Sequence, residues 1–252
     1  MYMLYFGFFV LMISHYTTYS YTFLNEIQKK NLWHAGGSLR LHLGCGVHRL
    51  PGYVNIDFPL SEHNIIQTVR ADIFTDISTL ELPADCVDEI RSHHLFEHFQ
   101  RTDAFLLLCK WHCWLKEGAT LLIETPDFEE SVKLFLLPST LYPAKQAILR
   151  HIFGSQEAAW AIHYDGWYEE KFRSVLTELG FEIINIEHTR WQSTANIIVT
   201  ARKKIALTMD ELMRRSKELL KLSLIDHSES EIRQWAYWCK SMHAGNRLTA
   251  LP

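Results

Sequence analysis

The chain carries a glycine turn and an acid whose spacing suits the binding of a nucleoside. An apolar run, Leu39–Leu43, leads into the turn Gly44-Cys45-Gly46, and a second apolar run ends at Asp57. Glycines let the backbone turn tightly and let a ligand approach without a Cβ in the way. A carboxylate at the end of the second strand can accept hydrogen bonds from both hydroxyls of a ribose. The stretch therefore predicts a nucleotide pocket at the carboxyl edge of a parallel sheet.

The turn is not built to seat a pyrophosphate. A dinucleotide fingerprint needs a third glycine three residues after Gly46, where this chain has Arg49, and the Gly-Lys-Ser/Thr of a P-loop is absent. A ligand with a ribose and no phosphate fits better. Asp72 and Ile73 follow the apolar run Ile65–Val69 and are placed to receive an adenine, with the acid accepting from its amine. The alternative is that both acids are ordinary loop residues.

A histidine-rich segment, Ser92-His93-His94-Leu95-Phe96-Glu97-His98, is the second stretch that could do chemistry. On a helix, His94 and His98 would lie one turn apart and could share a zinc ion, with Glu97 as base. That pattern would make the protein a zinc-dependent hydrolase. A third ligand is not evident, so we assign no metal ligand. The other alternative is that these histidines are structural.

Seven apolar runs alternate with helical patterns along the chain. The strands are expected at Leu39–Leu43, Tyr53–Ile56, Ile65–Val69, Cys86–Ile90, Thr120–Glu124, Phe181–Glu187 and Ala195–Ala201. The helices are expected at Tyr21–Ala35, from Thr102 or Asp103 to Gly118, from Asp127, at Pro143–Phe153 and at Trp167–Leu179. The alternation predicts an α/β, Rossmann-like three-layer sandwich. Its mostly parallel seven-stranded sheet would end in an antiparallel hairpin and carry a helical tail.

Three regions are expected: an apolar N-terminal segment at 1–24, a main domain at 25–204 and a helical hairpin extension at 205–252. The first region has no Asp, Glu, Lys or Arg, but its apolar part is short for a transmembrane helix. It is a weak membrane anchor, a helix packed on the domain or a stretch that results from an upstream start codon. Lys29 and Lys30 follow it, so an anchored chain would keep its main domain on the cytoplasmic side.

Bulk composition excludes several classes of protein. The net charge of −4 and the absence of a Lys/Arg-rich run speak against nucleic-acid binding. Five scattered cysteines make neither a disulfide framework nor a zinc knuckle, so a reducing, cytoplasmic setting is expected. Half the residues are hydrophobic, as in a globular chain with a large core.

The part of the chain from about residue 39 to residue 201 resembles the class I S-adenosylmethionine (SAM)-dependent methyltransferases of the type-11-like group. More narrowly, it is similar to small predicted methyltransferases associated with saccharide biosynthesis. The resemblance rests on Leu-His-Leu-Gly-Cys-Gly, Pro-Gly-Tyr-Val-Asn-Ile-Asp, Ala-Asp-Ile, Val-Asp-Glu-Ile-Arg-Ser-His-His-Leu-Phe-Glu-His-Phe and Leu-Lys-Glu-Gly-Ala-Thr-Leu-Leu-Ile-Glu-Thr-Pro-Asp. Two positions depart from the class: His42 stands where an acid is usual, and His48 where a glycine is common.

The resemblance implies a methyl transfer from SAM to an acceptor, with a sugar hydroxyl as the leading candidate. It implies that the cofactor site comprises Gly44, Cys45, Gly46, Asp57, Asp72, Ile73, Ser92 and His93. A hydroxyl acceptor must lose its proton, and histidine suits that task. We expect His93 or His163 to be the base and the segment 138–168 to shape the acceptor pocket. Asp127 reads better as a helix cap than as a catalyst. A small molecule, a lipid-linked molecule or a protein stays open as acceptor, as does a non-catalytic SAM-binding module.

Overall fold

The computed structural model describes residues 22–65 and 67–248. Most of the segment expected at 1–24 therefore lies outside the described residues. Residues 22–29 form a helix whose apolar side, with Phe23, Leu24 and Ile27, is buried in the core. Among the described helices, none has the length and apolar character needed to cross a bilayer.

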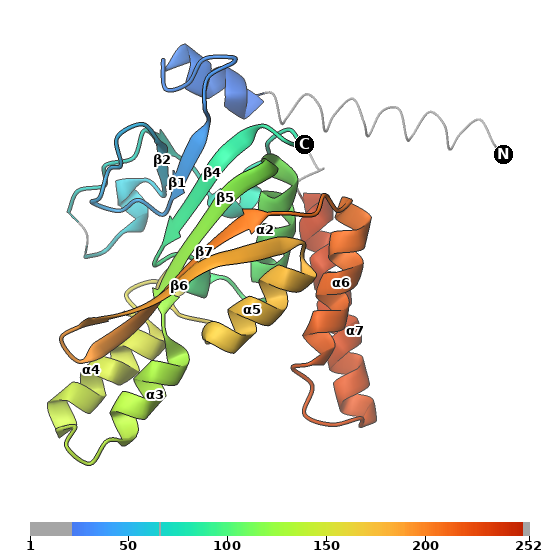
Figure 1. The fold of residues 1–252 in the computed structure, drawn as a ribbon. Coiled ribbons are helices and arrows are strands. Elements are labelled where there is room, and N and C mark those ends of the chain that lie inside the picture. The colour runs from blue at the N-terminus through green and yellow to red at the C-terminus, as the bar shows by residue number, and fades with distance from the viewer. Residues whose placement is uncertain (1–21, 66, 249–252) are drawn as a thin grey trace.

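The strands form one sheet in the order β3-β2-β1-β4-β5-β7-β6 (Figure 1). The first five are parallel to one another, and β7 is antiparallel to both β5 and β6. This is the expected Rossmann-like α/β fold with a closing antiparallel hairpin. The strands are β1 Arg40–Leu43, β2 Val54–Asp57, β3 Ile73–Phe74, β4 Val87–His93, β5 Leu115–Pro126, β6 Phe181–Trp191 and β7 Thr194–Lys203.

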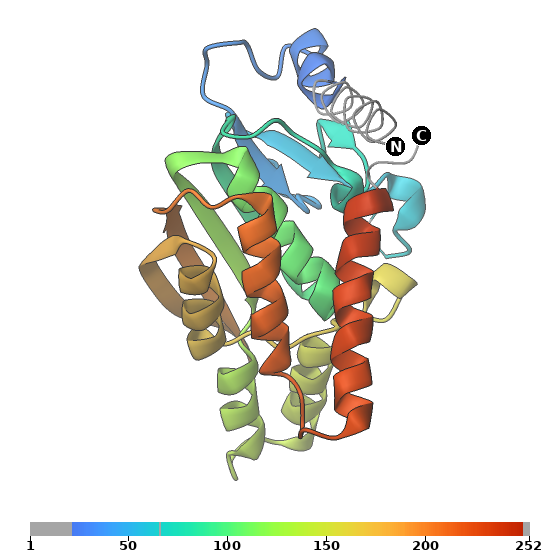
Figure 2. The same cartoon turned by 90° about the vertical axis from the view of Figure 1, so that its right-hand side faces the viewer.

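The helices lie mainly on one face of the sheet. The short ones are η1 Leu60–Glu62, η2 Ile77–Thr79, η3 Phe96–His98 and η4 Ala159–Ala161. The long ones are α2 Arg101–Trp114, α3 Phe128–Leu136, α4 Tyr142–Phe153, α5 Glu169–Glu178, α6 Met209–Lys221 and α7 Glu229–Leu248. Figure 2 shows α6 and α7 in front of α2, which lies between them and the sheet. Figure 1 shows α3 and α4 at the end of the sheet where the β6–β7 hairpin turns.

The position of α2 explains its composition. A helix with neighbours on all sides is apolar around its whole circumference, and nearly every residue of α2 is buried. Its one buried cation, Lys110, pairs with Glu81 at 2.7 Å and donates to the carbonyl of Ser78. The helical tail therefore covers a second side of α2 rather than standing apart from the main domain.

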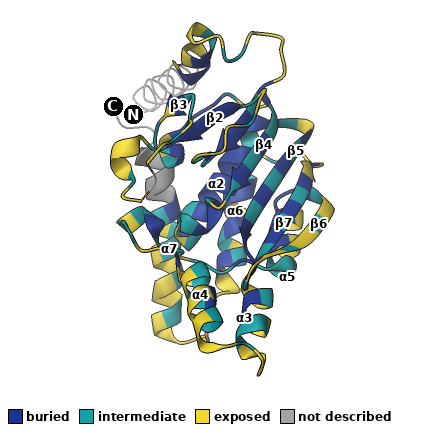
Figure 3. Cartoon of the chain, turned by 90° about the vertical axis from the view of Figure 1, so that its left-hand side faces the viewer, coloured by how far each residue is buried: buried dark blue, intermediate teal, exposed yellow. Residues whose placement is uncertain are grey.

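The opposite face of β1, β2 and β4 is polar and is turned toward the viewer in Figure 3. The loop 44–53 between β1 and β2 contains no helix, as its length and Pro51 lead one to expect. Register places His42, Asn55 and Arg91 side by side on one face, with His93 two residues further along β4. This face therefore presents hydrogen-bonding side chains close to the carboxyl ends of the strands.

The third strand differs from expectation. Residues 65 and 67–69 have no strand structure, and Ile65 is 64% exposed. The strand beside β2 is the two-residue β3, Ile73–Phe74, which pairs with Ile56 and Asp57. The prediction of a strand at Ile65–Val69 was therefore wrong, because the actual strand is too short to show an apolar pattern.

Two helix boundaries were also wrong. The helix α2 ends at Trp114, because Leu115 already pairs with Val87 in the sheet. Gly118, the expected helix end, lies within β5 with a φ of +75°, where the register between β4 and β5 shifts. The first helix was expected to reach residue 35, but the helix at 22–29 ends at 29.

Candidate cofactor and acceptor site

The glycine turn and Asp57 are joined by a direct hydrogen bond. The amide of Gly46 donates to Asp57 Oδ2 at 2.6 Å, and the amide of Phe58 donates to Oδ1 at 2.7 Å. The amides of Gly44 and Cys45 both donate to the carbonyl of Ile56. The turn after β1 and the end of β2 thus form a single polar unit.

Gly44 and Gly46 both need glycine conformations, for different reasons. Gly44 has a φ of +70°, and a Cβ there would lie 2.8 Å from the Cβ of Leu95. Gly46 has a φ of +51°, and a Cβ there would meet nothing within 4 Å. The space at Gly46 is thus open toward any ligand that approaches the turn.

His63 lies against the carboxylate of Asp57, and Trp160 packs against His63. His63 Nε2 is 3.4 Å from Asp57 Oδ1, and the side chain of His63 is only 4% exposed. The ring of Trp160 stands edge-on to His63, with the ring centroids 5.0 Å apart. The indole nitrogen of Trp160 donates to the carbonyl of Glu62 and ties η4 to the segment after β2. A ribose would reach Asp57 only by displacing this cover.

Asp72 is not at the carboxyl end of β3 but immediately before the strand. Its Oδ2 accepts from the backbone and side-chain nitrogens of Asn55, at 3.0 and 2.8 Å, and its Oδ1 from Arg49 at 2.6 Å. Burial alone would raise the pKa of this carboxyl, but these donors outweigh it and lower the pKa. Ile73 is buried in the core. The structure thus places Asp72 beside the loop that follows the glycine turn, with its carboxylate held by Arg49 and Asn55.

Asp76 occupies the position that the sequence assigned to Asp72. It follows β3 directly after Thr75, whose amide donates to the carbonyl of Asp57 at 3.0 Å. Its Oδ1 accepts from the amide and hydroxyl of Ser78 and caps η2. The signal that could have found it is its place in Asp76-Ile77, a second acid–isoleucine pair four residues downstream.

A chain of hydrogen bonds fixes the protonation of His93. The Nδ2 of Asn55 donates to three oxygens, those of Leu50, Tyr53 and Asp72, so its Oδ1 is the acceptor. His42 Nδ1 lies 3.0 Å from that Oδ1 and must therefore carry the proton. His42 Nε2 is then unprotonated, and it accepts a hydrogen bond from His93 Nδ1 at 3.1 Å. His93 is left with a basic Nε2.

Burial keeps both rings of this chain neutral. It lowers the pKa of His42, and it lowers the pKa of His93 to about 4, with repulsion from His42 adding to the effect. At neutral pH, His93 is therefore a hydrogen-bond acceptor at Nε2 and can take up a proton. Ser92, beside it in β4, is fully buried, and its hydroxyl has no hydrogen-bond partner among the described residues.

His94 and His98 do not share a helix face, which removes the basis of the zinc-hydrolase pattern. His94 has a φ of +47°, and the single 3-10 turn η3 begins only at Phe96. His94 lies 3.6 Å from Glu124 Oε1 and 3.4 Å from Glu97 Oε1. Burial would lower its pKa, but these two carboxylates outweigh burial and raise the pKa to about 10. His94 is thus a fixed cation at neutral pH.

His163 lies against Glu97 rather than beside His93. Its Nε2 is 3.9 Å from Glu97 Oε1, and the amide of Tyr164 donates to the carbonyl of Glu97 at 2.9 Å. Its ring centroid is 4.5 Å from that of His98. Burial lowers the pKa of His163 to about 4. The structure thus attaches the irregular segment to η3 and forms a second histidine cluster there.

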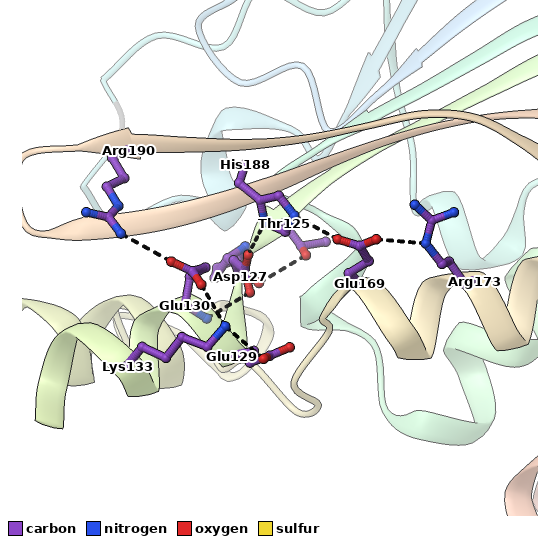
Figure 4. A network of polar contacts seen from close by, with 10 residues as sticks. Thr125, Asp127, Glu129, Glu130, Lys133, Glu169, Arg173, His188 and Arg190 are labelled. Carbon is purple, nitrogen blue, oxygen red and sulfur yellow. Dashed lines mark hydrogen bonds and ion pairs between the residues drawn. The ribbon is translucent and has the colours of Figure 1, made fainter.

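Asp127 is the cap of α3, as its sequence context indicates. Its Oδ1 accepts from the amide of Glu130 at 3.1 Å, while Oδ2 lies 2.7 Å from His188 Nδ1. Figure 4 shows His188 bridging Asp127 and Glu169, which in turn pairs with Arg173. The two carboxylates raise the pKa of His188. These contacts of Asp127 are thus structural.

Sequence reasoning missed Glu124, His151 and Asn196. His151 Nε2 lies 2.7 Å from Asn196 Oδ1, and Asn196 Nδ2 donates to Glu124 Oε1 at 3.4 Å. Glu124 could have been noticed as the one charged residue in the stretch 121–126. The other two come from α4 and β7, and no local pattern marks them.

No protein-family model matches the sequence, and no curated protein matches it. Solved structures of methyltransferases do resemble the fold. A SAM-dependent methyltransferase from Methanosarcina mazei has 14% identity and a TM-score of 0.46, over 69% of this chain and 96% of that one. One from Mesorhizobium loti has 15% identity and a TM-score of 0.45, over 69% and 94%. The magnesium protoporphyrin IX methyltransferase from Synechocystis with bound SAH has 14% identity and a TM-score of 0.43, over 76% and 84%. At these values the likeness concerns the fold alone.

Proposed function

We propose that the protein is a methyltransferase that uses SAM and methylates a hydroxyl, with a sugar hydroxyl as the preferred acceptor. The observation that carries the proposal is the 2.6 Å hydrogen bond from Gly46 to Asp57, which unites the glycine turn with the acid. Both lie at the carboxyl ends of β1 and β2, next to the point where the strand order reverses between β1 and β4. In open α/β sheets, ligands bind at that point.

The residues fit a nucleoside without a phosphate. A carboxylate has about four lone-pair positions, so Asp57 can accept from a ribose while it keeps its two amide donors. The open space at Gly46 follows β1, which pairs with the strand of Asp57, and the unpartnered hydroxyl of Ser92 lies on β4, at the other side of β1. We assign the adenine to the loop after β3, with Asp76 in place of Asp72 and Ile73.

The chemistry assigned to the chain is positioning and proton uptake. SAM, when bound, supplies a methyl group that is already activated on a sulfonium. The chain must hold the acceptor hydroxyl in line with that methyl, which is catalysis by proximity. His93 takes the hydroxyl proton at Nε2, because His42 already accepts the proton on Nδ1. The Nε2 atom of His163, the other expected base, is 3.9 Å from Glu97 Oε1. We assign His163 to the part of the site that binds the methyl acceptor.

Transfer of a labelled methyl group tests the function. The full chain is incubated with methyl-labelled SAM and a panel of nucleotide sugars and oligosaccharides, and the products are separated and counted. We expect one acceptor class to gain label and the His93→Ala, His163→Ala double variant to lose most of that transfer. Full turnover by the double variant would contradict the roles assigned to His93 and His163. SAM binding without transfer to any acceptor would favour a binding module.

A further inference from the structure

We propose that Glu97, His98 and His163 form a binding site for a divalent transition-metal ion of the Zn²⁺ class. These side chains come from η3 and from the segment after η4. Each offers one ligand atom, and the three atoms all lie within 4.8 Å of one another. The site differs from the sequence pattern because His94 is replaced by His163, which is 69 residues further on in the chain.

The strongest reason is that the cluster leaves buried polar atoms without partners. The residue Glu97 is 1% exposed, yet neither of its carboxylate oxygens has a hydrogen-bond partner among the described residues. The Nδ1 atoms of His98 and His163 are buried and equally unpartnered. A buried carboxylate without hydrogen bonds costs several kcal/mol, so such groups normally pair with a cation or bind a metal.

The nearest cation does not meet this need. His94 Nδ1 approaches Glu97 Oε1 to 3.4 Å without hydrogen-bond alignment, and its Nε2 faces Glu124. The other oxygen of Glu97 has no hydrogen-bond partner among the described residues, and His163 Nε2 lies 3.9 Å from the same Oε1 that His94 approaches. The ring planes of His98 and His163 cross at 83° with centroids 4.5 Å apart, so the two imidazoles do not stack.

The donor set suits zinc-like ions. Two imidazoles and one carboxylate are the protein ligands of open zinc sites, with bonds of about 2.0–2.2 Å and a fourth position for water or substrate. Ligand atoms about 3.3 Å apart would satisfy a tetrahedral ion, so closing the cluster requires only side-chain rotations. A cavity of about 10 Å³, lined in part by Glu97 and His163, adjoins Phe128 and Gly166. That is roughly the space of one small particle such as a water or an ion.

The site lies beside the carboxyl ends of β4 and β5, on the side where the acceptor was placed. If the proposed function holds, the open position of the ion would bind the acceptor oxygen and make its proton easier to remove. Metal binding itself does not depend on that function, and the two are tested separately.

Metal titration of the full chain tests the site. The protein is dialysed against EDTA and titrated with Zn²⁺ alone by calorimetry, and with Co²⁺ followed by visible absorption. We expect one ion per chain and the d–d bands of four-coordinate cobalt. His98→Gln and His163→Gln should each weaken Zn²⁺ binding by more than about tenfold, since even the loss of an outer-shell partner of a metal site costs that much. These two variants retain a polar side chain and spare the fully buried Glu97.

His151→Gln is the matched control, because His151 lies near His94 but bonds Asn196 instead of the cluster. It should bind Zn²⁺ as the unchanged protein does. Absence of Zn²⁺ binding, or binding unaffected by both cluster variants, would overturn the site, and a buried water would then explain the cavity. Titration with SAM separates the two proposals. If the unchanged protein binds Zn²⁺ but not SAM, the methyltransferase function alone is contradicted.

Discussion

His42 Nε2 lies 3.1 Å from His93 Nδ1, and this contact fixes which nitrogen of His93 carries a proton. The chain of hydrogen bonds runs from the side-chain amide of Asn55 through His42 to His93, so both histidine rings are Nδ1–H tautomers. His93 sits at the end of β4, and its free Nε2 is the atom to which we assign proton uptake.

Nitrogen NMR checks the tautomers without knowledge of the acceptor. We expect His42 and His93 to show a protonated Nδ1 and an unprotonated Nε2 at neutral pH. In His42→Phe, His93 loses its partner and should return toward the Nε2–H form that the free histidine side chain prefers. The exposed His48→Ala is the control and should change neither ring. An Nε2–H tautomer for His93 in the unchanged protein would contradict the assigned base.

Ligand binding should move the cover over Asp57. His63 and Trp160 occupy the approach to this carboxylate, so bound SAH must displace them. We expect SAH to change the tryptophan fluorescence, and Trp160→Phe to remove most of that change while altering the affinity by about threefold or less. The exposed Trp191→Phe should keep the signal. An unchanged signal in Trp160→Phe would mean that η1 and η4 stay in place.

Gly44→Ala should cost more stability than Gly118→Ala. Both glycines have φ near +70°, so both substitutions carry backbone strain of about 1–2 kcal/mol. Only at Gly44 would the new Cβ meet another side chain, the Cβ of Leu95 at 2.8 Å. Urea unfolding should show the excess cost at Gly44, and adding Leu95→Ala should relieve part of it. Equal costs at the two glycines would contradict a close approach of Leu95 to the turn.

Acid should destabilise the protein between about pH 6.5 and pH 4, through histidines that the fold keeps neutral. Burial lowers the pKa of His112 to about 4, and its Nε2 donates to the carbonyl of Ile205. Between these pH values the unfolded chain binds a proton at His112 and the folded chain does not, so stability falls as pH falls. The shift sets a ceiling of about 3 kcal/mol for this ring.

His112→Gln isolates that contribution. The variant should be less stable at neutral pH and should lose less stability than the unchanged protein between pH 6.5 and pH 4. Urea unfolding over a pH series measures the difference, and the exposed His227→Gln should leave the pH slope unchanged. An identical slope in His112→Gln would show that this ring takes up its proton over the same pH range in the folded and the unfolded chain.

The sequence predicts the central strands well because their patterns are local. Leu39–Leu43 and Tyr53–Ile56 are apolar runs bounded by glycines, and each marks its strand to within one residue. The two-residue β3 has no such pattern, so the third strand was predicted at Ile65–Val69. Asp72 was therefore expected after the third strand, whereas it precedes β3. Gly118 misled for a related reason, since a positive φ occurs both at helix ends and at irregularities in strands.

The candidate site was only half accessible from sequence. The turn and Asp57 are close in the chain, and their partnership follows from strand order. His163 meets Glu97 only because the amide of Tyr164 bonds to the carbonyl of Glu97, a contact that no spacing announces. Lys110 likewise reads as a polar residue of a surface helix until the tail is seen to cover α2 and Glu81 to meet it.

The central claim is that Asp57 and the glycine turn bind SAM, and calorimetry tests it most directly. Titration of SAM and SAH into the full chain should show one site per chain. Asp57→Asn should weaken binding by about tenfold or more, since charge-assisted hydrogen bonds are worth about 1.5–3 kcal/mol. Asp72→Asn, at the residue just before β3, should weaken SAM and SAH binding far less. Absence of binding, or equal affinity in Asp57→Asn, would contradict the account.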